Sequence, residues 1–481
     1  MKKRHLPTHR PRPLAALLAV MLTACASTPP PYAPPSAAAP ASFKEAPAAD
    51  ATWFPAAPAD ALDRGPWWQL FGDPTLTALV EQVEVSNQTV AAAVANYAQA
   101  QALVRQDRAA LFPSVNLDGS ASRGGGPASA GKPVSSQLSL GASWEPDLWG
   151  VLRQGVSSVQ ASAQISAANL AAARLSAQAA LATDYFSLRE ADNEIALLGA
   201  AVAAYERSLR ITRNQYDAGI AQRTDVLQAQ TQLETTRANL TAMRAQRANL
   251  EHAIALLVGK APGEFSVAVA DWKASVPGVP LVLPSDLLQR RPDIAAAERA
   301  VAVANANIGI QRAAYFPSMS LSASAGGTGS SLASLFRSSA NLWSLGLSAS
   351  QTIFDAGAIK ARVEGAEAAR DAAVANYRQA VLNAFGAVED QLATSHSLAE
   401  QEGQRRAASA DADRSEQLTL NQYLQGQVPY TSVVTAQVTA LSARQTLSQL
   451  MSSRQASAIA LIQALGGGWH MPAAAEAKTP R

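Results

Sequence analysis

Residues that could perform acid–base, nucleophilic or metal chemistry are few in this 481-residue chain, and they stand far apart. Cys25 is the only cysteine. Catalytic metal sites and hydrolase active sites need their ligands or nucleophiles at fixed short spacings, and neither a metal-ligand spacing nor a nucleophile elbow occurs. The histidines are scattered: His5, His9, His252, His396 and His470. We therefore expect no enzyme activity, no metal and no dissociable cofactor.

One glycine-rich stretch has the spacing of a phosphate-binding loop, Gly126-Pro127-Ala128-Ser129-Ala130-Gly131-Lys132. Such loops need a serine or threonine after the lysine to hold the metal, and they lie between a buried strand and a helix. Pro133 follows Lys132 and offers neither a hydroxyl nor a backbone N–H. The stretch is interpreted as a surface loop and not as a nucleotide site.

Cys25 is the residue for which the sequence indicates definite chemistry. Residues 1–24 have a basic start, an apolar run and small residues before the cysteine, which is the pattern of an export signal peptide. The cut would fall in Leu22-Thr23-Ala24-Cys25, which resembles the bacterial lipobox. We therefore expect Cys25 to be acylated. Each acyl methylene buried in a membrane contributes about 0.8 kcal/mol, so the acyl chains would hold the protein on the membrane. An ordinary secretory signal with an incidental cysteine is the alternative.

The mature chain begins with a segment that has no periodic apolar pattern. Residues 25–60 are rich in proline and alanine, which predicts an extended, lipidated tether. The basic residues before Cys25 account for the positive net charge, and their removal leaves more acidic than basic residues. This balance gives no support to a nucleic-acid partner. No later stretch is apolar for long enough to form a spanning helix, so membrane crossing would require β-strands.

The two halves of the chain repeat each other. Residues 108–114, Arg-Ala-Ala-Leu-Phe-Pro-Ser, return with one change as residues 312–318, which lie 204 positions later. The stretch Asn-Gln-Tyr at 214–216, with its glycine at 219, returns at 421–423 with glycine at 426, now 207 positions later. Matches in the same order at nearly constant offset indicate an internal duplication.

Each half is predicted as a short helix, two strands, a very long helix, a tight turn and a short helix. The first helix is expected over about 76–111, ending where Phe112 precedes Pro113. Apolar residues then alternate with serine, glycine and asparagine, as at 115–118, 138–144, 318–325 and 345–349. This alternation is typical of membrane β-barrel strands and also of a half-buried soluble sheet, so the residues alone leave both open.

The long helices are expected over about 151–216 and 358–423, each spanning about 100 Å. Steps of three and four from Ala191 to Tyr216, and from Tyr377 to Leu392, predict coiled-coil seams that form core. Gly219 and Gly426 are expected to close these helices in a left-handed conformation. Short helices near 224–258 and 431–465 would then return antiparallel, stacked end to end with the short helices that open each half.

Four strands cannot close on themselves, and open strand edges cannot lie in lipid. Three copies would provide 12 strands and 12 helical columns around an aqueous lumen, although geometry alone does not choose three over four.

Several motifs add a family resemblance that covers nearly the whole mature chain. They are the duplicated pattern, Trp67 to Pro74, Leu283 to Ile294, and Phe-Pro-Ser in both halves. The chain closely resembles the TolC/OprM-like outer-membrane efflux lipoproteins. The resemblance implies a mainly α fold with a membrane β-barrel: a homotrimer with a 12-stranded barrel on a 12-column periplasmic α-barrel, and an equatorial belt that includes the segment near Lys260–Pro284. It also implies a periplasmic adaptor and an inner-membrane RND-type pump as partners.

In that family the turns at the far ends of the helices contact the adaptor and close the duct. Transferred by position, the candidate residues are Gly219, Arg223, Thr224, Asp225, Gly426, Tyr430, Thr431 and Ser432. Arg223 and Asp225 could belong to a gate of ion pairs, or the turn could be an ordinary surface turn with Thr224 as N-cap. Some relatives carry an acidic ring after the second turn; Ser432 and Thr435 stand at those positions here, which argues against a divalent-cation site.

The predicted function is the passive outer-membrane channel of a tripartite efflux pump, lipid-anchored in the outer membrane with its α-barrel in the periplasm. The alternatives are a type I protein-secretion duct and a periplasmic adaptor lipoprotein, although adaptors carry one helical hairpin and this chain has two. The predicted divisions are: 1–24 signal peptide, 25–60 tether, 61–259 first repeat, 260–284 equatorial segment, 285–467 second repeat and 468–481 tail.

Overall fold

The computed structural model describes residues 32–36, 38–40, 42–45, 65–123, 135–272, 274–279, 290–329, 335 and 341–467. The predicted signal peptide, Cys25, the glycine-rich stretch 126–132 and the tail 468–481 lie outside these residues.

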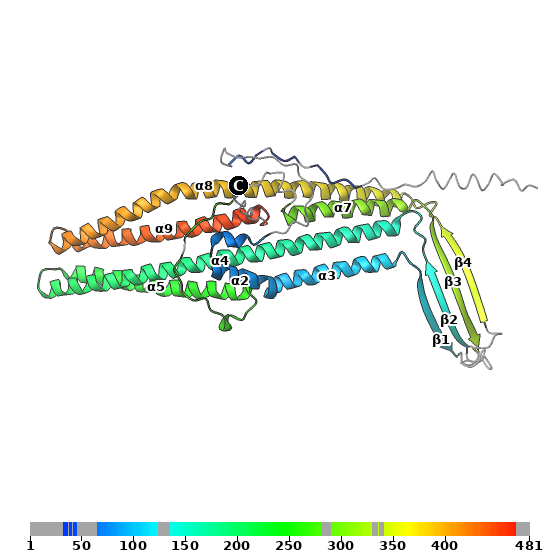
Figure 1. Ribbon diagram of the computed structural model, residues 1–481, viewed down its shortest axis with the longest axis horizontal. Coiled ribbons are helices and arrows are strands. Elements are labelled where there is room, and N and C mark those ends of the chain that lie inside the picture. Colours follow the sequence, from blue (N-terminus) through cyan, green and yellow to red (C-terminus); the bar gives the residue numbers. More distant parts are fainter. Residues whose placement is uncertain are drawn as a thin grey trace, which may run out of the picture. The chain divides into compact units, whose positions relative to one another are not determined.

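The described elements form two matching series (Figure 1). The first is α3 (Gln88–Ala109), β1 (Ser114–Ser122), β2 (Ser135–Trp144), α4 (Val151–Asp217) and α5 (Arg223–Leu257). The second is α7 (Pro292–Ala313), β3 (Ser318–Gly329), β4 (Asn341–Ser350), α8 (Ala358–Leu424) and α9 (Tyr430–Ala464). Helices α4 and α8 each have 67 residues, α5 and α9 each 35, and α3 and α7 each 22. The predicted duplicated unit is confirmed.

The prediction of one helix over 76–111 is wrong. The 3-10 helix η1 (Trp67–Phe71) leads into α2 (Pro74–Ser86), and Asn87 separates α2 from α3. The Asn87 Oδ1 atom accepts a hydrogen bond from the N–H of Val90, at 3.0 Å, and thereby caps α3. Its Nδ2 atom donates to the carbonyl of Leu257 at the end of α5, at 2.8 Å. The same side chain therefore caps α3 and binds a carbonyl 170 residues away.

The same joint occurs in the second half. Arg291, immediately before α7, donates from Nη1 to the carbonyl of Ala464 at the end of α9, at 2.9 Å. Gly259 and Gly466 follow the two helix ends with positive φ, 70° and 89°. A β-carbon on Gly259 would lie 2.1 Å from the backbone oxygen of Ser86. Each short helix α3 or α7 thus starts against the end of α5 or α9, as the predicted end-to-end stacking requires.

The chain divides into two compact units, each built from segments of both halves. The first unit comprises residues 1–36, 97–166 and 297–377 and contains one antiparallel sheet in the order β1-β2-β3-β4. In its register Leu117 faces Leu140, Leu140 faces Ala325, and Ala325 faces Trp343. The adjacent row on the opposite face is polar and small, with Asn116, Gly141, Ser324 and Ser344. The sheet is therefore apolar on one face and polar on the other.

The second unit comprises residues 37–96, 167–296 and 378–481. Its main core joins η1 and α2 to the middle of α4 and the ends of α5 and α9, with Trp67, Leu76, Leu181, Tyr185 and Ile459 among the most buried side chains. In this unit α4 with α5 and α8 with α9 form antiparallel hairpins (Figure 1). The predicted seams are buried or half-buried, except that Tyr216 at the end of the first is exposed.

Among the helices in the described ranges, none is both long enough and apolar enough to cross a membrane.

Candidate functional site

The two turns that end the long helices have the same backbone. Gly219 and Gly426 both have φ of 74°, as predicted for residues that close a helix. The N–H of Gly219 donates to the carbonyl of Tyr216, and that of Ile220 to the carbonyl of Gln215, at 2.9 and 2.8 Å. The second turn repeats both bonds from Gly426 and Gln427 to Tyr423 and Gln422, each at 2.9 Å. These are the two bonds of a Schellman motif, which satisfies the last carbonyls of a helix.

The first turn corrects the expected cap. Gln222 is the N-cap of α5, and Thr224 lies inside the helix. The Asp225 carboxylate accepts from the N–H of Gln222 at 3.3 Å, and the Thr224 hydroxyl donates to Oε1 of Gln222, also at 3.3 Å. A capping box places a carboxylate three residues after the N-cap, and Asp225 stands at that distance from Gln222 and not from Thr224. Arg223 is exposed and forms no ion pair with Asp225 or with any other described residue.

The second turn carries an aromatic pair in place of charges. Tyr430, the first residue of α9, packs edge-on against Tyr423 near the end of α8, with ring centroids 5.2 Å apart. Both rings are buried, and burial raises the pKa of Tyr430 to about 12. Thr431 is exposed and Ser432 is half-buried. The pair is therefore neutral across the physiological pH range.

This tyrosine pair joins the second hairpin to the first. The Tyr423 hydroxyl donates to Oε1 of Gln215 on α4. The Tyr430 hydroxyl lies beside the hydroxyls of Ser208 and Thr212, also on α4. Asp225 is close enough for its charge to help raise the pKa of Tyr423, after the larger effect of burial. Of the predicted residues, the structure therefore brings Asp225 and Tyr430 to one place and leaves Arg223, Thr224 and Thr431 exposed.

Gln215 and Tyr423 were missed as site residues, although both lie in the repeated Asn-Gln-Tyr motif. The motif indicated duplication, and no pattern within one half distinguishes the buried Tyr423 from its exposed counterpart Tyr216, which is 44% exposed.

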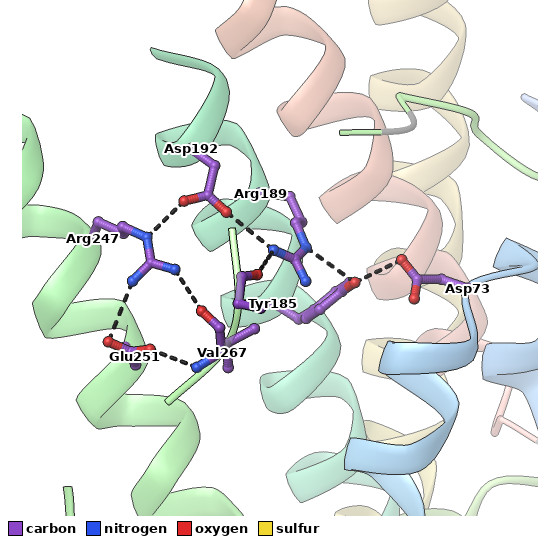
Figure 2. A network of polar contacts seen from close by, with 8 residues as sticks. Asp73, Tyr185, Arg189, Asp192, Arg247, Glu251 and Val267 are labelled. Atoms are coloured by element: carbon purple, nitrogen blue, oxygen red, sulfur yellow. Dashed lines mark hydrogen bonds and ion pairs between the residues drawn. The ribbon is translucent and has the colours of Figure 1, made fainter. Parts of the chain in front are cut away.

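A polar network in the second unit fixes part of the segment between the halves (Figure 2). Asp192 on α4 accepts from Arg189 at 3.0 Å and from Arg247 on α5 at 2.6 Å. The two guanidinium groups also donate to the carbonyls of Ala268 and Val267, each at 2.7 Å. The side chains of Arg189 and Asp192 are almost fully buried, so each charge depends on its partners.

The network continues on both sides (Figure 2). Glu251 binds Arg247 at 3.3 Å and accepts from the N–H of Val267 at 2.6 Å. The Tyr185 hydroxyl donates to the Asp73 carboxylate at 2.7 Å and accepts from Arg189 at 3.1 Å. Burial, with the bond to Asp73, raises the pKa of Tyr185 to about 12. Since Asp73 also caps α2, the network holds α2, α4, α5 and residues 267–268 in one arrangement.

Two further acids lie between α4 and α9: Glu194 is buried and Glu190 is half-buried. The Nε2 atom of Gln445 donates to Oε1 of Glu194, whose Oε2 atom is buried with no hydrogen-bond partner in the described chain. Ser448 donates to Glu190 at 3.3 Å. Burial raises the pKa of both carboxyls, and the charge of Glu194 adds to the rise at Glu190.

The described part of the predicted tether makes contacts that its composition did not indicate. Phe43 is buried, and the N–H groups of Lys44 and Glu45 donate to the Glu389 carboxylate on α8, at 2.8 and 3.0 Å. Residues 42–45 have neither helix nor strand structure. The burial of Phe43 and the two hydrogen bonds to Glu389 hold this part in place beside α8.

A family model described as outer membrane efflux protein matches residues 79–260 and 283–467, which together are most of the chain. The chain belongs to the outer membrane efflux protein family. Two curated relatives are similar over most of their length. The probable efflux pump outer membrane protein TtgC of Pseudomonas putida strain KT2440 is 32% identical, with 95% of each chain covered. The cation efflux system protein CusC of Escherichia coli O6:H1 is 31% identical, covering 85% of this chain and 90% of CusC.

The solved structure of the outer-membrane channel OprN matches 92% of this chain and 99% of its own, with a TM-score of 0.80 and 30% identity. The outer membrane efflux family is a transport family and not an enzyme family. The chain is the outer-membrane channel component of a tripartite efflux pump, located in the outer membrane with a periplasmic helical barrel. The predicted fold class, the function as an outer-membrane efflux channel and the outer-membrane localisation are confirmed, and the lipid anchor stays a prediction.

Proposed function

We propose that three copies of this chain form a passive, lipid-anchored duct that carries small molecules out of the cell from an inner-membrane RND-type pump and its periplasmic adaptor. The main support is the two-faced sheet. On its apolar face Leu117 is 69% exposed, Trp343 81% and Leu345 69%. A half-buried soluble sheet would cover such side chains, whereas lipid favours them on the outside of a barrel. This observation favours the membrane interpretation of the alternating strands.

The sheet edges support assembly of several copies. Strands β1 and β4 are the edges of the sheet, and each carries backbone groups that need a partner in lipid. Two copies would give a barrel filled by side chains, whereas three leave a lumen. The polar face would line that lumen, where serines already pair across strands, as between Ser320 and Ser348 at 2.7 Å and between Ser324 and Ser344 at 2.9 Å.

The relatives support small molecules as the cargo without selecting one. By name, one belongs to a toluene efflux pump, one to an antibiotic efflux pump, one to a solvent efflux pump and one to a cation efflux system. Related channels that serve pumps for such different cargo are consistent with a lumen that does not discriminate. We therefore assign selectivity to the inner-membrane pump and its adaptor.

The anchor in this proposal is a lipid on Cys25. It rests on the lipobox-like sequence Leu22 to Cys25, and on the basic and apolar stretches that precede it. Acyl chains would hold each protomer at the membrane in addition to the barrel.

Native mass spectrometry of protein extracted in detergent from outer membranes tests the proposal. We expect the mass of three protomers, each beginning at an acylated Cys25, and steady ion conductance when the same sample is added to a planar bilayer. Cys25→Ala serves as the control: it should lose the acyl mass while the barrel still forms. A monomer without conductance would contradict the duct, and an unacylated Cys25 in the trimer would contradict the anchor alone.

A further inference from the structure

The duplication places the same hydroxyl groups in two grooves, one on each hairpin. Ser208 and Thr212 on α4 recur 207 positions later as Ser415 and Thr419 on α8. Thr224 on α5 recurs as Thr431 on α9. Because the paired helices have equal lengths and the turns have equal backbones, the two grooves have the same framework.

The first groove is filled from within the chain. Tyr430 lies against Ser208 and Thr212 and is only 2% exposed. Tyr423 lies next to it and binds Gln215. Both tyrosines come from the second hairpin, so this contact joins one hairpin to the other through two aromatic rings.

The second groove is open. A cavity of about 390 Å³ lies between α8 and α9, lined by residues that include Ser415, Thr419, Thr431 and Ser432. The residues that correspond by position to Tyr423 and Tyr430 are Tyr216 and Arg223. Both are exposed, and so is Leu227 one turn further along α5. One chain therefore carries an unfilled groove and, on its other hairpin, the side chains that would fill it.

These side chains cannot meet the open groove within one chain. The first hairpin already packs on α9 through α4, where Tyr205, Leu209 and Tyr430 share one core. Its Tyr216 lies in the last turn of α4 and its Arg223 is the first residue of α5, and both side chains are exposed outside that contact. Only another molecule can bring an equivalent hairpin to α8.

We propose that the groove between α8 and α9 receives Tyr216 and Arg223 of a second copy of this chain, in the same way that the first groove receives Tyr423 and Tyr430. The proposal rests on the trimeric duct proposed above. The hydroxyl oxygens of Ser415, Thr419 and Ser432 can accept hydrogen bonds from the guanidinium and phenol groups. The joint between protomers is then more polar than the joint within a protomer, because an arginine stands where the second hairpin has Tyr430.

Cross-linking with a matched pair tests the proposal. The variant Arg223→Cys with Thr419→Cys is treated, in membranes, with a short bismaleimide and analysed on a denaturing gel. We expect bands at two and three protomer masses. Tyr430→Cys with Thr212→Cys, the corresponding pair within the chain, should cross-link at the mass of one protomer. Unmodified protein controls for reaction at Cys25, and Tyr216→Cys with Ser415→Cys provides a second pair between protomers.

The outcomes separate this inference from the proposed function. If native mass spectrometry gives a trimer for both double variants while neither links protomers, the groove has another occupant and the inference is wrong. If the unmodified protein is a monomer, the proposed duct itself fails. If Arg223→Cys with Thr419→Cys cross-links only at the mass of one protomer, the two positions meet within one chain and the inference is wrong.

Discussion

At the scale of single residues, Glu194 makes stability depend on pH. Burial raises the pKa of its carboxyl above the ordinary 4.5, so the neutral form is favoured in the folded protein. The stabilising contribution is complete below the unfolded value and is lost as pH rises through the raised pKa, at about 1.4 kcal/mol per pKa unit. We predict that Glu194→Gln raises the melting temperature at neutral pH and changes it little near pH 4.5, as measured by circular dichroism.

Glu81→Gln on the exposed side of α2 is the matched control for this prediction and should leave both melting temperatures unchanged. Equal melting temperatures for Glu194→Gln and the unmodified protein at neutral pH would show that Glu194 is solvated and charged in the assembled protein.

The helix-end positions Gly219 and Gly259 differ in how strongly they require glycine. Gly219 has positive φ but open space around it, so Gly219→Ala should cost about 1 kcal/mol of unfolding free energy for the left-handed conformation alone. Gly259 has similar φ, and an added β-carbon would lie 2.1 Å from a backbone oxygen. Gly259→Ala should therefore cost about 3 kcal/mol or more. Thermal unfolding of the two variants side by side measures the difference; equal losses would contradict the close packing of Gly259 on Ser86.

The turn glycines could be predicted from sequence because a glycine after a long periodic stretch leaves few alternatives. The filling of the first groove by Tyr423 and Tyr430 could not be predicted from the sequence. Tyr216 and Tyr423 have the same local sequence before them, and only packing of the second hairpin on α4 buries one and exposes the other.

At the scale of elements, Asp192 holds α4 and α5 to the segment after α5. Removing its charge leaves the buried Arg189 and the half-buried Arg247 without their shared counter-ion, and breaking a buried pair in this way typically costs about 3–5 kcal/mol. We predict that Asp192→Asn lowers the melting temperature strongly and makes the chain near Val267 sensitive to limited proteolysis. Glu206→Gln removes half of the exposed pair with Arg237 on the same two helices, and should cost no more than about 1 kcal/mol. Protease resistance at Val267 in Asp192→Asn would refute the fixing role of the network.

The ends of the long helices agree with the sequence prediction within one residue, because coiled-coil periodicity and breaker residues act locally. The break at Asn87 was not predicted, because residues 76–111 favour helix by composition, although asparagine is itself a favoured N-cap residue. The competing interaction is the bond from Asn87 to Leu257, which exists only after α5 has folded back.

At the scale of the whole molecule, the proposed contact between copies makes the stability of the trimer depend on the residue at position 223. We predict that Arg223→Tyr makes the joint between protomers resemble the joint within one, and adds on the order of 2 kcal/mol per joint through burial of a ring. The trimer should then dissociate to monomers at a higher temperature on a detergent gel. Arg213→Tyr, at an exposed position on α4, is the control and should leave that temperature unchanged. A lower dissociation temperature for Arg223→Tyr would show that the arginine makes a bond that tyrosine cannot replace.

The register of the sheet has a consequence for the order of folding. Strands β2 and β3 are neighbours, with Ser136 opposite Gly329, yet the whole of α4, α5 and α7 lies between them in the chain. Pairings that close so long a loop form slowly unless other structure first brings the ends together. The α4–α5 hairpin does this, because its contacts are local: Glu206 meets Arg237 only 31 residues away. We expect the helical hairpin to form early and the central seam of the sheet to close late, so that nascent chains expose two separate strand pairs before they carry one sheet.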